Sequence, residues 1–568
     1  MFPVAPLPVD SPRLPAATRA FSVKWNKVSL VTSLLMLLNI AAMPMKAYFS
    51  EEFPWQSDDG PVPVFGNLAA DDPAYLALMQ TLFNRVTLAG RPSFVYNATL
   101  RCDIFRGRLD LRHKRPVPLD DCVSFYYGTP GLMFYAPSLL DALCPLAATD
   151  HRNATWPDEM TWQSHGGCEV VMLLGVHLSQ GCLWLDVGDD LNNGTSPPTP
   201  GVFTLTYAFQ RPKYFKWLWF KFVYRLGLIA YVVWVTYARY YAHCVALRAI
   251  LVANGHRVPR PSPDWSYELL IGDPTALVLS DPIVCTLFFV DIWLSTGVAG
   301  VALSRAMQVE DFYYTFLSLL YLSRMVWLAY LALCLLSKVL KRYHKENYFR
   351  ELDKTLVAIG IFLSFIPFTY VQANTPMVHV YLWLSWLLPT KDPRTQIDVT
   401  LGGGLFTLLI ANFPVIFGLV SQRFPRRHHR VATQRTRFAS QTFNGFKARV
   451  ILYLARYCAP KQRNVVESGG SIYAALAADA CYKQCPTMGL RSVDCFLLCK
   501  RQGIPRHMIR LSLASSLDRN LLNPALAITE DTAKAGTTVF GHINSVALGP
   551  QSRTFTLQRG SVQSAWLA

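Results

Sequence analysis

Asp291 and Arg324 are ionisable residues inside two stretches of the chain that are otherwise apolar. Charged side chains within a membrane span are costly, and they mark candidate functional positions. On adjacent antiparallel helices the two would form an ion pair, which lowers the cost of burying either charge. Their expected depths differ by about 8 Å at 1.5 Å per residue. Two alternatives therefore stay open: a water-filled polar cavity, or spans with other boundaries.

A cluster of four cysteines is the sharpest local pattern in the chain. The spacing is Cys-x3-Cys-x9-Cys-x3-Cys, formed by Cys481, Cys485, Cys495 and Cys499. Residues four apart share one face of a helix, so two facing helices would bring four sulfurs together. In a reducing compartment such thiolates bind zinc, the only cofactor that the sequence suggests. Acylated or oxidisable cysteines and free structural cysteines are the alternative interpretations.

The sequence holds no pattern of a catalytic site. It has no Gly-x-x-x-x-Gly-Lys-Ser/Thr loop for phosphates. It also shows no evident pairing of a nucleophile with a base, and no ligand set for a catalytic metal. We therefore predict that the protein is not an enzyme.

Residues 46–213, between the first two apolar stretches, carry the marks of an exported domain. All three N-glycosylation sequons of the chain lie there, at Asn97, Asn153 and Asn193. Five cysteines lie in the same region, where disulfides persist: Cys102, Cys122, Cys144, Cys168 and Cys182. Five choices of free thiol and three pairings of the rest give fifteen arrangements. Among these pairs we favour Cys168 with Cys182, which bracket an apolar run that enters a turn.

The exported domain is expected to mix helices and strands. Residues 74–85 have helical spacing, whereas residues 124–127 and 203–209 look extended and are rich in aromatic residues or threonine.

Six apolar stretches have about the length that the ~30 Å hydrocarbon core of a bilayer requires. They are residues 28–45, 217–238, 283–303, 316–337, 356–372 and 399–420. A seventh, residues 377–388, reaches only about 18 Å as a helix, so we expect it to re-enter the membrane or lie at its surface. A composition of 52% hydrophobic and 16% charged residues agrees with a membrane protein.

Positive charge predicts that both ends of the chain are cytosolic. Residues 421–568 carry 21 Lys and Arg against 6 Asp and Glu, a net charge of +15 in a chain of +17, whereas residues 46–213 carry 12 against 18. Lysine and arginine also precede the first span and follow the second and fourth, as on cytosolic flanks. Because the basic tail begins beside a span, its predicted partners are the bilayer and anionic inner-leaflet lipids, not nucleic acid.

The first span is predicted to be a retained anchor. Its apolar core of about 18 residues is longer than the core of a signal peptide, and a Pro-rich leader precedes it. Cleavage of this segment is the alternative, and it would leave the remaining topology unchanged.

The predicted fold is a mostly α membrane protein with six transmembrane helices, one α+β exported domain between the first and second, and a basic cytosolic tail. The chain is expected to begin with a cytosolic leader 1–27, an anchor 28–45 and a glycosylated exported domain 46–213. A five-helix membrane region 214–420 that contains the short segment 377–388 follows, then a basic region 421–522 with an amphipathic helix at 443–458 and the cysteine cluster, and a poorly ordered tail 523–568.

Several short motifs lie around the third and fourth spans: GDPTAL at 272–277, Asp281-Pro282, QVED at 308–311 and SRMVW at 323–327. Together they resemble a family of multispanning oomycete membrane proteins with no assigned activity. The resemblance covers residues 270–375 and implies no mechanism.

The overall plan is similar to that of polycystin and mucolipin channels, with six spans, a glycosylated domain after the first and a short helix before the last. That similarity implies a cation filter of carbonyls and acidic side chains after the short helix. In this chain the corresponding residues, PTKDPR at 389–394, mix both charges.

Together these features predict a surface or endomembrane receptor or interaction protein. Its exported, disulfide-containing domain is expected to meet an external protein ligand, and an oligomer is possible. An ion channel or transporter is the alternative function.

Overall fold

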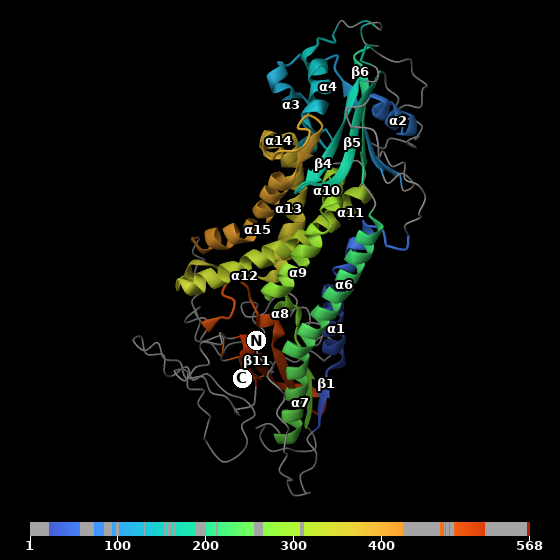
Figure 1. Ribbon diagram of the computed structural model, residues 1–568. Helices are drawn as coiled ribbons and strands as arrows, with labels where there is room; N and C mark the ends of the chain where they lie inside the picture. The colour runs from blue at the N-terminus through green and yellow to red at the C-terminus, as the bar shows by residue number, and fades with distance from the viewer. Residues whose placement is uncertain are drawn as a thin grey trace.

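The computed structural model is elongated, with one β-sheet at each end of a helical region (Figure 1). It describes residues 22–56, 73–83, 94–97, 102–129, 131–152, 165–187, 200–211, 214–254, 265–306, 312–423, 466–470, 482–516 and 565–567, with single positions near 160 and at 472 and 476.

A six-stranded sheet forms the core of the predicted exported domain. Its order is β2-β3-β6-β5-β4-β8, antiparallel except for the parallel pair β4 and β8. Along β5, Leu183 and Leu185 pack with α4, whereas Cys182 and Trp184 pack with Met79 of α2. Because alternate residues of a strand point to opposite faces, these helices cover the two faces of the sheet. The elements are α2 (Pro73–Phe83), β2 (Phe94–Asn97), β3 (Cys102–Asp110), η2 (Leu119–Asp121), α3 (Cys122–Phe125), η3 (Leu132–Phe134), α4 (Pro137–Ala148), β4 (Gly166–Leu173), β5 (Val176–Val187), β6 (Val202–Gln210) and β8 (Gln396–Asp398).

The domain is therefore α+β, as predicted, with one local error. The extended segment 203–209 is β6, and the helical segment 74–85 is α2. Residues 124–127 begin within the short helix α3 and continue into a turn, so their prediction as a strand was wrong. The run is too short for its aromatic content to outweigh the helical turn that starts at Cys122.

The exported domain also includes chain from between the last two long helices. β8 pairs with β4 through Val170 and Gln396. Helix α14 (Met377–Leu387) adds Val378 and Leu382 to the same hydrophobic cluster. The short apolar stretch thus packs on the exported domain, and residues 46–213 alone do not make the whole sheet.

Among the described residues, four helices are long and apolar enough to span a membrane, consistent with an integral membrane protein. They are Phe215–Val252, Phe312–Arg342, Lys354–Asn374 and Thr400–Arg423. The helices of this region are α1 (Lys27–Ala41), η1 (Met45–Phe49), α6 (Phe215–Thr236), η5 (Tyr237–Tyr241), α7 (Ala242–Asn254), α8 (Thr275–Leu279), α9 (Pro282–Trp293), α10 (Thr296–Ala306), α11 (Phe312–Leu322), η6 (Ser323–Met325), α12 (Val326–Arg342), η7 (Glu346–Tyr348), α13 (Lys354–Asn374) and α15 (Thr400–Arg423).

The predicted first and third spans differ from simple helices. The first is a 15-residue helix, α1, which is short for a span. The third is two helices, α9 and α10, which meet at a 75° bend. The described residues therefore do not form six straight spans.

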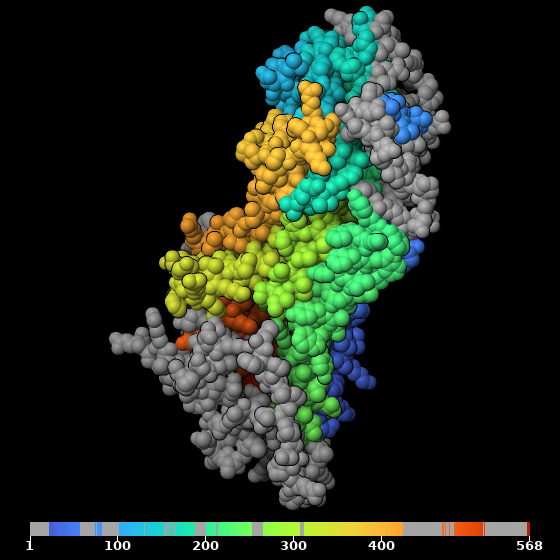
Figure 2. Space-filling view, in the orientation of Figure 1, coloured from blue at the N-terminus to red at the C-terminus, as the bar shows by residue number. Residues whose placement is uncertain are grey.

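The outer faces of these helices are apolar and uncovered. Leu35, Trp234, Leu363 and Phe417 each leave more than half of their surface exposed. In Figure 2 the green side chains of α6 lie on the outside of the helical region. Soluble proteins rarely expose such large apolar surfaces, whereas a lipid bilayer covers them.

The second sheet gathers segments from three distant parts of the chain. The order β1-β7-β10-β11-β12, with β9 beside β11, combines the N-terminal segment, the segment after α7 and the tail. Helix α7 covers one face through Leu247 and Leu251. The strands are β1 (Val23–Trp25), β7 (Trp265–Leu270), β9 (Val466–Gly469), β10 (Cys495–Arg501), β11 (Ile504–Leu513) and β12 (Trp566–Leu567), and η9 (Arg491–Val493) and η10 (Ala514–Ser516) flank the hairpin of β10 and β11. The N-terminal segment, the segment after α7 and the tail, which the charge pattern predicts to be cytosolic, thus pair in one sheet.

Of two predictions for the tail, the structure bears on one, the poorly ordered C-terminal segment. The amphipathic helix at 443–458 lies outside the described residues. The poorly ordered tail needs a correction at its end, because Trp566 is buried and β12 pairs with Ser512 and Leu513. The indole contributes apolar area to the core beneath α7.

Candidate functional site: a buried charge network

Five charged side chains meet where the helical region approaches the exported domain. Glu51 follows η1, Lys221 and Arg225 lie one turn apart on α6, Asp291 lies in the last turn of α9, and Arg324 lies in η6. Residues four apart share one helical face, so α6 presents both of its cations to the same neighbours. All five residues are buried.

Glu51 is bound by side chains of two helices, α6 and α11. Its carboxylate oxygens lie 2.7 Å from Lys221 Nζ and 2.8 Å from Arg225 Nη2. The Tyr321 hydroxyl donates to Glu51 at 2.7 Å. A residue just beyond the first helix is therefore fixed to α6 and α11.

Asp291 is held by two arginines. Arg225 Nε donates to its Oδ1 at 2.8 Å, and Arg324 forms a close ion pair with its Oδ2. Arg225 also donates to the Ser295 hydroxyl at 3.0 Å, at the bend between α9 and α10. The negative end of the α9 dipole lies in this last turn, where it favours cations.

The network carries a surplus of positive charge. Three cations face two carboxylates, so its formal charge is +1. Among the described residues, Nη1 of Arg225 is buried without a hydrogen-bond acceptor, whereas Nη1 of Arg324 lies 3.5 Å from Oε1 of Glu51. A buried donor without a partner is costly, so Nη1 of Arg225 offsets part of the stability that the ion pairs provide.

The helices are broken at the level of the network. The axis turns by 75° between α9 and α10, and the 3-10 segment η6 interrupts the helix that runs from α11 to α12. The Tyr321 hydroxyl lies 3.5 Å from the carbonyl oxygen of Ser295 at the bend, which accepts its hydrogen bond. Breaks of this kind free backbone groups for polar contacts inside a membrane region.

The sequence identified only part of this site. Asp291 and Arg324 do meet, as the ion-pair hypothesis expected, because the helix breaks bring their different depths together. Glu51, Lys221 and Arg225 were missed. The signal for two of them was present: two cations four residues apart inside the second apolar stretch.

A second buried carboxylate lies in the exported domain. Glu169 on β4 accepts hydrogen bonds from the Tyr207 hydroxyl at 2.9 Å and from the backbone N–H of Ala136 at 2.6 Å. Burial raises the pKa of Glu169 to about 8, although both hydrogen bonds act in the opposite direction. This carboxyl group therefore changes its charge near neutral pH.

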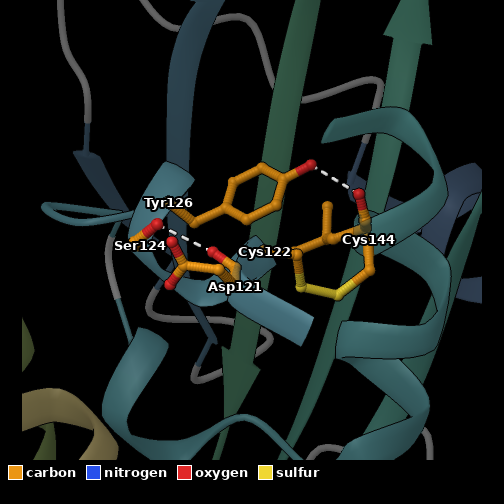
Figure 3. Close-up of a disulfide and its surroundings, with 6 residues drawn as sticks. Asp121, Cys122, Ser124, Tyr126 and Cys144 are labelled. Atoms are coloured by element: carbon orange, nitrogen blue, oxygen red, sulfur yellow. Dashed lines mark hydrogen bonds between the residues drawn. A yellow bond between two sulfur atoms is a disulfide. The ribbon is translucent and has the colours of Figure 1, made fainter. Parts of the chain in front are cut away.

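Four of the five cysteines in the predicted exported domain form disulfides. Cys168 and Cys182 are directly opposed on β4 and β5 with Cα atoms 4.1 Å apart, which confirms the favoured pair. Cys122 bonds to Cys144 and joins α3 to α4 (Figure 3). Beside it the Tyr126 hydroxyl donates to the carbonyl of Leu143 at 2.6 Å. Cys102 is free and buried, and burial raises the pKa of its thiol.

Among the described tail cysteines, Cys485 lies in a different hydrophobic cluster from Cys495 and Cys499. Cys495 and Cys499 lie on strand β10, so their predicted helical placement was wrong. Residues four apart also share a face in a strand, and the pattern alone does not separate the two cases. Cys485 packs instead with the helices, 3.0 Å from the Ser337 hydroxyl. Cys481 lies outside the described residues, and within the described ones no three potential ligands form a metal site.

The glycosylation sites remain predictions. Asn97 ends strand β2, and Asn153 and Asn193 lie outside the described residues.

Comparisons with known proteins find no relative. No protein-family model, no curated protein and no solved structure matches this chain.

Proposed function

We propose that the protein is an integral membrane receptor, which transmits an event at its exported domain to the sheet at its other end. In this proposal residues 46–213 face the cell exterior or an endomembrane lumen, carry N-glycans and meet a protein ligand. Both termini are cytosolic, where their net positive charge matches anionic lipids.

The observation that carries the proposal is the path through α9 and α10. At one end, Asp273 N donates at 2.7 Å to the carbonyl of Ser492, just before β10. At the other end, Arg305 of α10 donates through Nε to Asp103 of β3 at 2.9 Å. The charge network holds the bend between these ends. A displacement of the exported sheet therefore has a continuous packed route to the distant one.

The test uses the full chain in lipid nanodiscs and an antibody fragment raised against the folded exported domain. We expect binding of the fragment to change hydrogen exchange in α8 and β10. A doubly substituted chain, Asp103→Asn with Arg305→Gln, removes the ion pair without leaving a buried charge. In this variant the distant change is expected to disappear while the fragment still binds.

The matched control replaces an exposed ion pair of the same domain, Asp150→Asn with Arg152→Gln. It is expected to behave as the wild type does. An exchange response confined to the exported domain in the wild type would contradict the proposal. An undiminished distant response in the Asp103/Arg305 variant would contradict the assigned route.

Transport is the second candidate, and the bent helix pair favours it. Transporters bind substrate where helices are interrupted near the middle of the membrane, and here Asp291 and Ser295 lie at such an interruption. Liposomes containing the purified chain would show ion or solute flux that Asp291→Asn alters. The short helix α14 gives less support to the channel analogy, because Val378 and Leu382 belong to the core of the exported domain, although Tyr381 packs with the helical region.

A further inference from the structure

A cavity of about 830 Å³ lies beside the charge network. It is bounded by the β4–β5 turn, the segment that joins β6 to α6, and the bend between α9 and α10. Its volume falls within the range of small-molecule sites, about 300 to 1,000 Å³. Lys221 and Glu51 form part of its wall, so the network borders the space directly.

The wall of the cavity has two chemical characters. Leu218, Phe289, Val290 and Trp293, from α6 and α9, provide an apolar surface between two helices of the membrane region. Arg211, Lys216 and His177 lie toward the exported domain, on or beside β5 and β6 and at the start of α6. A ligand that fills the space must therefore have an apolar part and a polar part.

The charged residues around the cavity determine whether the polar part of a ligand should be anionic or cationic. The cavity wall and the network together contain five cations and three carboxylates, an excess of two positive charges. The cations are Arg211, Lys216, Lys221, Arg225 and Arg324, and the carboxylates are Glu51, Glu52 and Asp291. An anionic group is favoured here.

Two polar atoms of the cavity wall also need a partner. Nε of Arg211 and Nε2 of His177 are buried without a hydrogen-bond partner among the described residues. A phosphate oxygen accepts hydrogen bonds from an arginine guanidinium. The guanidinium of Arg211 and the ammonium of Lys216 are the cations that an anion would meet on this part of the wall.

We propose that this cavity binds an anionic phospholipid from the adjoining leaflet. Its phosphate lies between Arg211, Lys216 and His177, and one acyl chain lies against Phe289, Val290 and Trp293. Tyr214 and Trp217, at the start of α6, also line the cavity, and residues of these types are enriched at the interface where lipid headgroups lie. The site stands independently of the receptor proposal, because it needs only the cavity and a bilayer.

The experiment reconstitutes the full chain in nanodiscs of phosphatidylcholine with or without phosphatidylglycerol. Lipid that remains bound after transfer to detergent is counted by native mass spectrometry. We expect phosphatidylglycerol to be retained about tenfold over phosphatidylcholine, since each basic residue near the headgroup favours an anionic lipid. Inorganic phosphate added to the phosphatidylcholine sample is expected not to raise the melting temperature as phosphatidylglycerol does.

Two variants separate the headgroup site from the acyl-chain site. Arg211→Gln with Lys216→Gln is expected to abolish the preference for phosphatidylglycerol. Val290→Trp fills apolar space and is expected to reduce retention of both lipids. Lys46→Gln removes a cation that does not line the cavity and is expected to leave retention unchanged.

Three results would overturn the proposal. They are equal retention of the two lipids by the wild type, a preference that survives the Arg211/Lys216 substitution, and a phosphate effect as large as that of the lipid, which would assign the cavity to a free anion. The first and third need only the wild-type chain, so they stand even if a variant fails to fold.

Discussion

Nε of Arg225 lies 2.8 Å from Oδ1 of Asp291, and both side chains are fully buried. The contact joins α6, a long candidate span, to the last turn of α9. It also explains why Asp291 is not simply one half of a pair with Arg324. Removing either charge therefore changes the charge balance of all five side chains in the network.

Asp291→Asn leaves three cations facing one carboxylate in a buried site. We expect this change to cost about 3 to 5 kcal/mol, because breaking a buried ion pair leaves an uncompensated charge. Asp291→Asn combined with Arg324→Gln restores the original formal charge of +1, and we expect it to recover at least half of the loss. Melting temperatures of the two single variants and the double variant in detergent measure the coupling. Strictly additive losses would show that the two residues act independently.

Glu169 predicts a pH dependence of the exported domain. The pKa of this carboxyl is about 8 in the folded chain against 4.5 when it is unperturbed. Between these values the folded chain holds a proton that the unfolded chain releases, so stability falls as pH rises through this window. Below about pH 4.5 both states are protonated and the contribution is complete.

The check is a series of melting curves from about pH 5 to about pH 8.5. Glu169→Gln mimics the protonated carboxyl, so its melting temperature is expected to depend less on pH than that of the wild type. Asp150→Asn, an exposed carboxylate outside this core, serves as the control. A variant that follows the wild-type slope would remove Glu169 as the cause.

The long helices were predictable because a membrane span is a local signal. Residues 356–372 fall within α13, and all but the first residue of 399–420 fall within α15, since about 20 apolar residues have few other stable conformations. The bend after Trp293 carries no comparable signal. It depends on Arg225 binding both Asp291 and Ser295, which is a tertiary contact.

The second sheet could not be predicted from local pattern. β1 and β7 are paired although about 240 residues separate Val23 from Tyr267, and β10 looked helical because its cysteines are four residues apart. Part of the charge network was accessible, however. Lys221 and Arg225 inside an apolar stretch are the kind of costly residues that mark a membrane site. Glu51 lies in a polar segment, where nothing in the sequence distinguishes it from Glu52.

The two disulfides predict a definite peptide map. Digestion without reduction should yield Cys122 linked to Cys144 and Cys168 linked to Cys182, with Cys102 alone as the free thiol of the exported domain. Cys122→Ser with Cys144→Ser is expected to cost about 3 kcal/mol, because the bridge closes a loop of 22 residues. A map that links Cys102 would contradict the assignment.

Glycosylation and protease access test the sidedness of the chain. Treatment with a glycosidase should lower the apparent mass, and replacement of Asn97, Asn153 and Asn193 by Gln should abolish that shift. On sealed cells a protease should reach residues 46–213 but neither terminus. A shift that survives the triple substitution, or a cleavable tail on intact cells, would contradict this topology.

Excision of residues 46–213 should give an incomplete domain. The excised chain lacks β8, so the edge of β4 loses its partner at Val170 and Met172. It also lacks Val378 and Leu382, which are buried in the same core. Unpaired strand edges and exposed apolar surface promote association between chains, and we expect the excised chain to aggregate.

Joining residues 375–399 to the excised chain through a flexible linker supplies both missing elements. We expect this chain to be monomeric in size-exclusion chromatography and to melt at a higher temperature. A matched chain with Val378→Asp and Leu382→Asp keeps the length but places charges in the core, and it should lose the gain because unpaired buried charges are costly. If residues 46–213 alone were monomeric and as stable as the joined chain, the contribution of β8 and α14 to the exported core would be refuted.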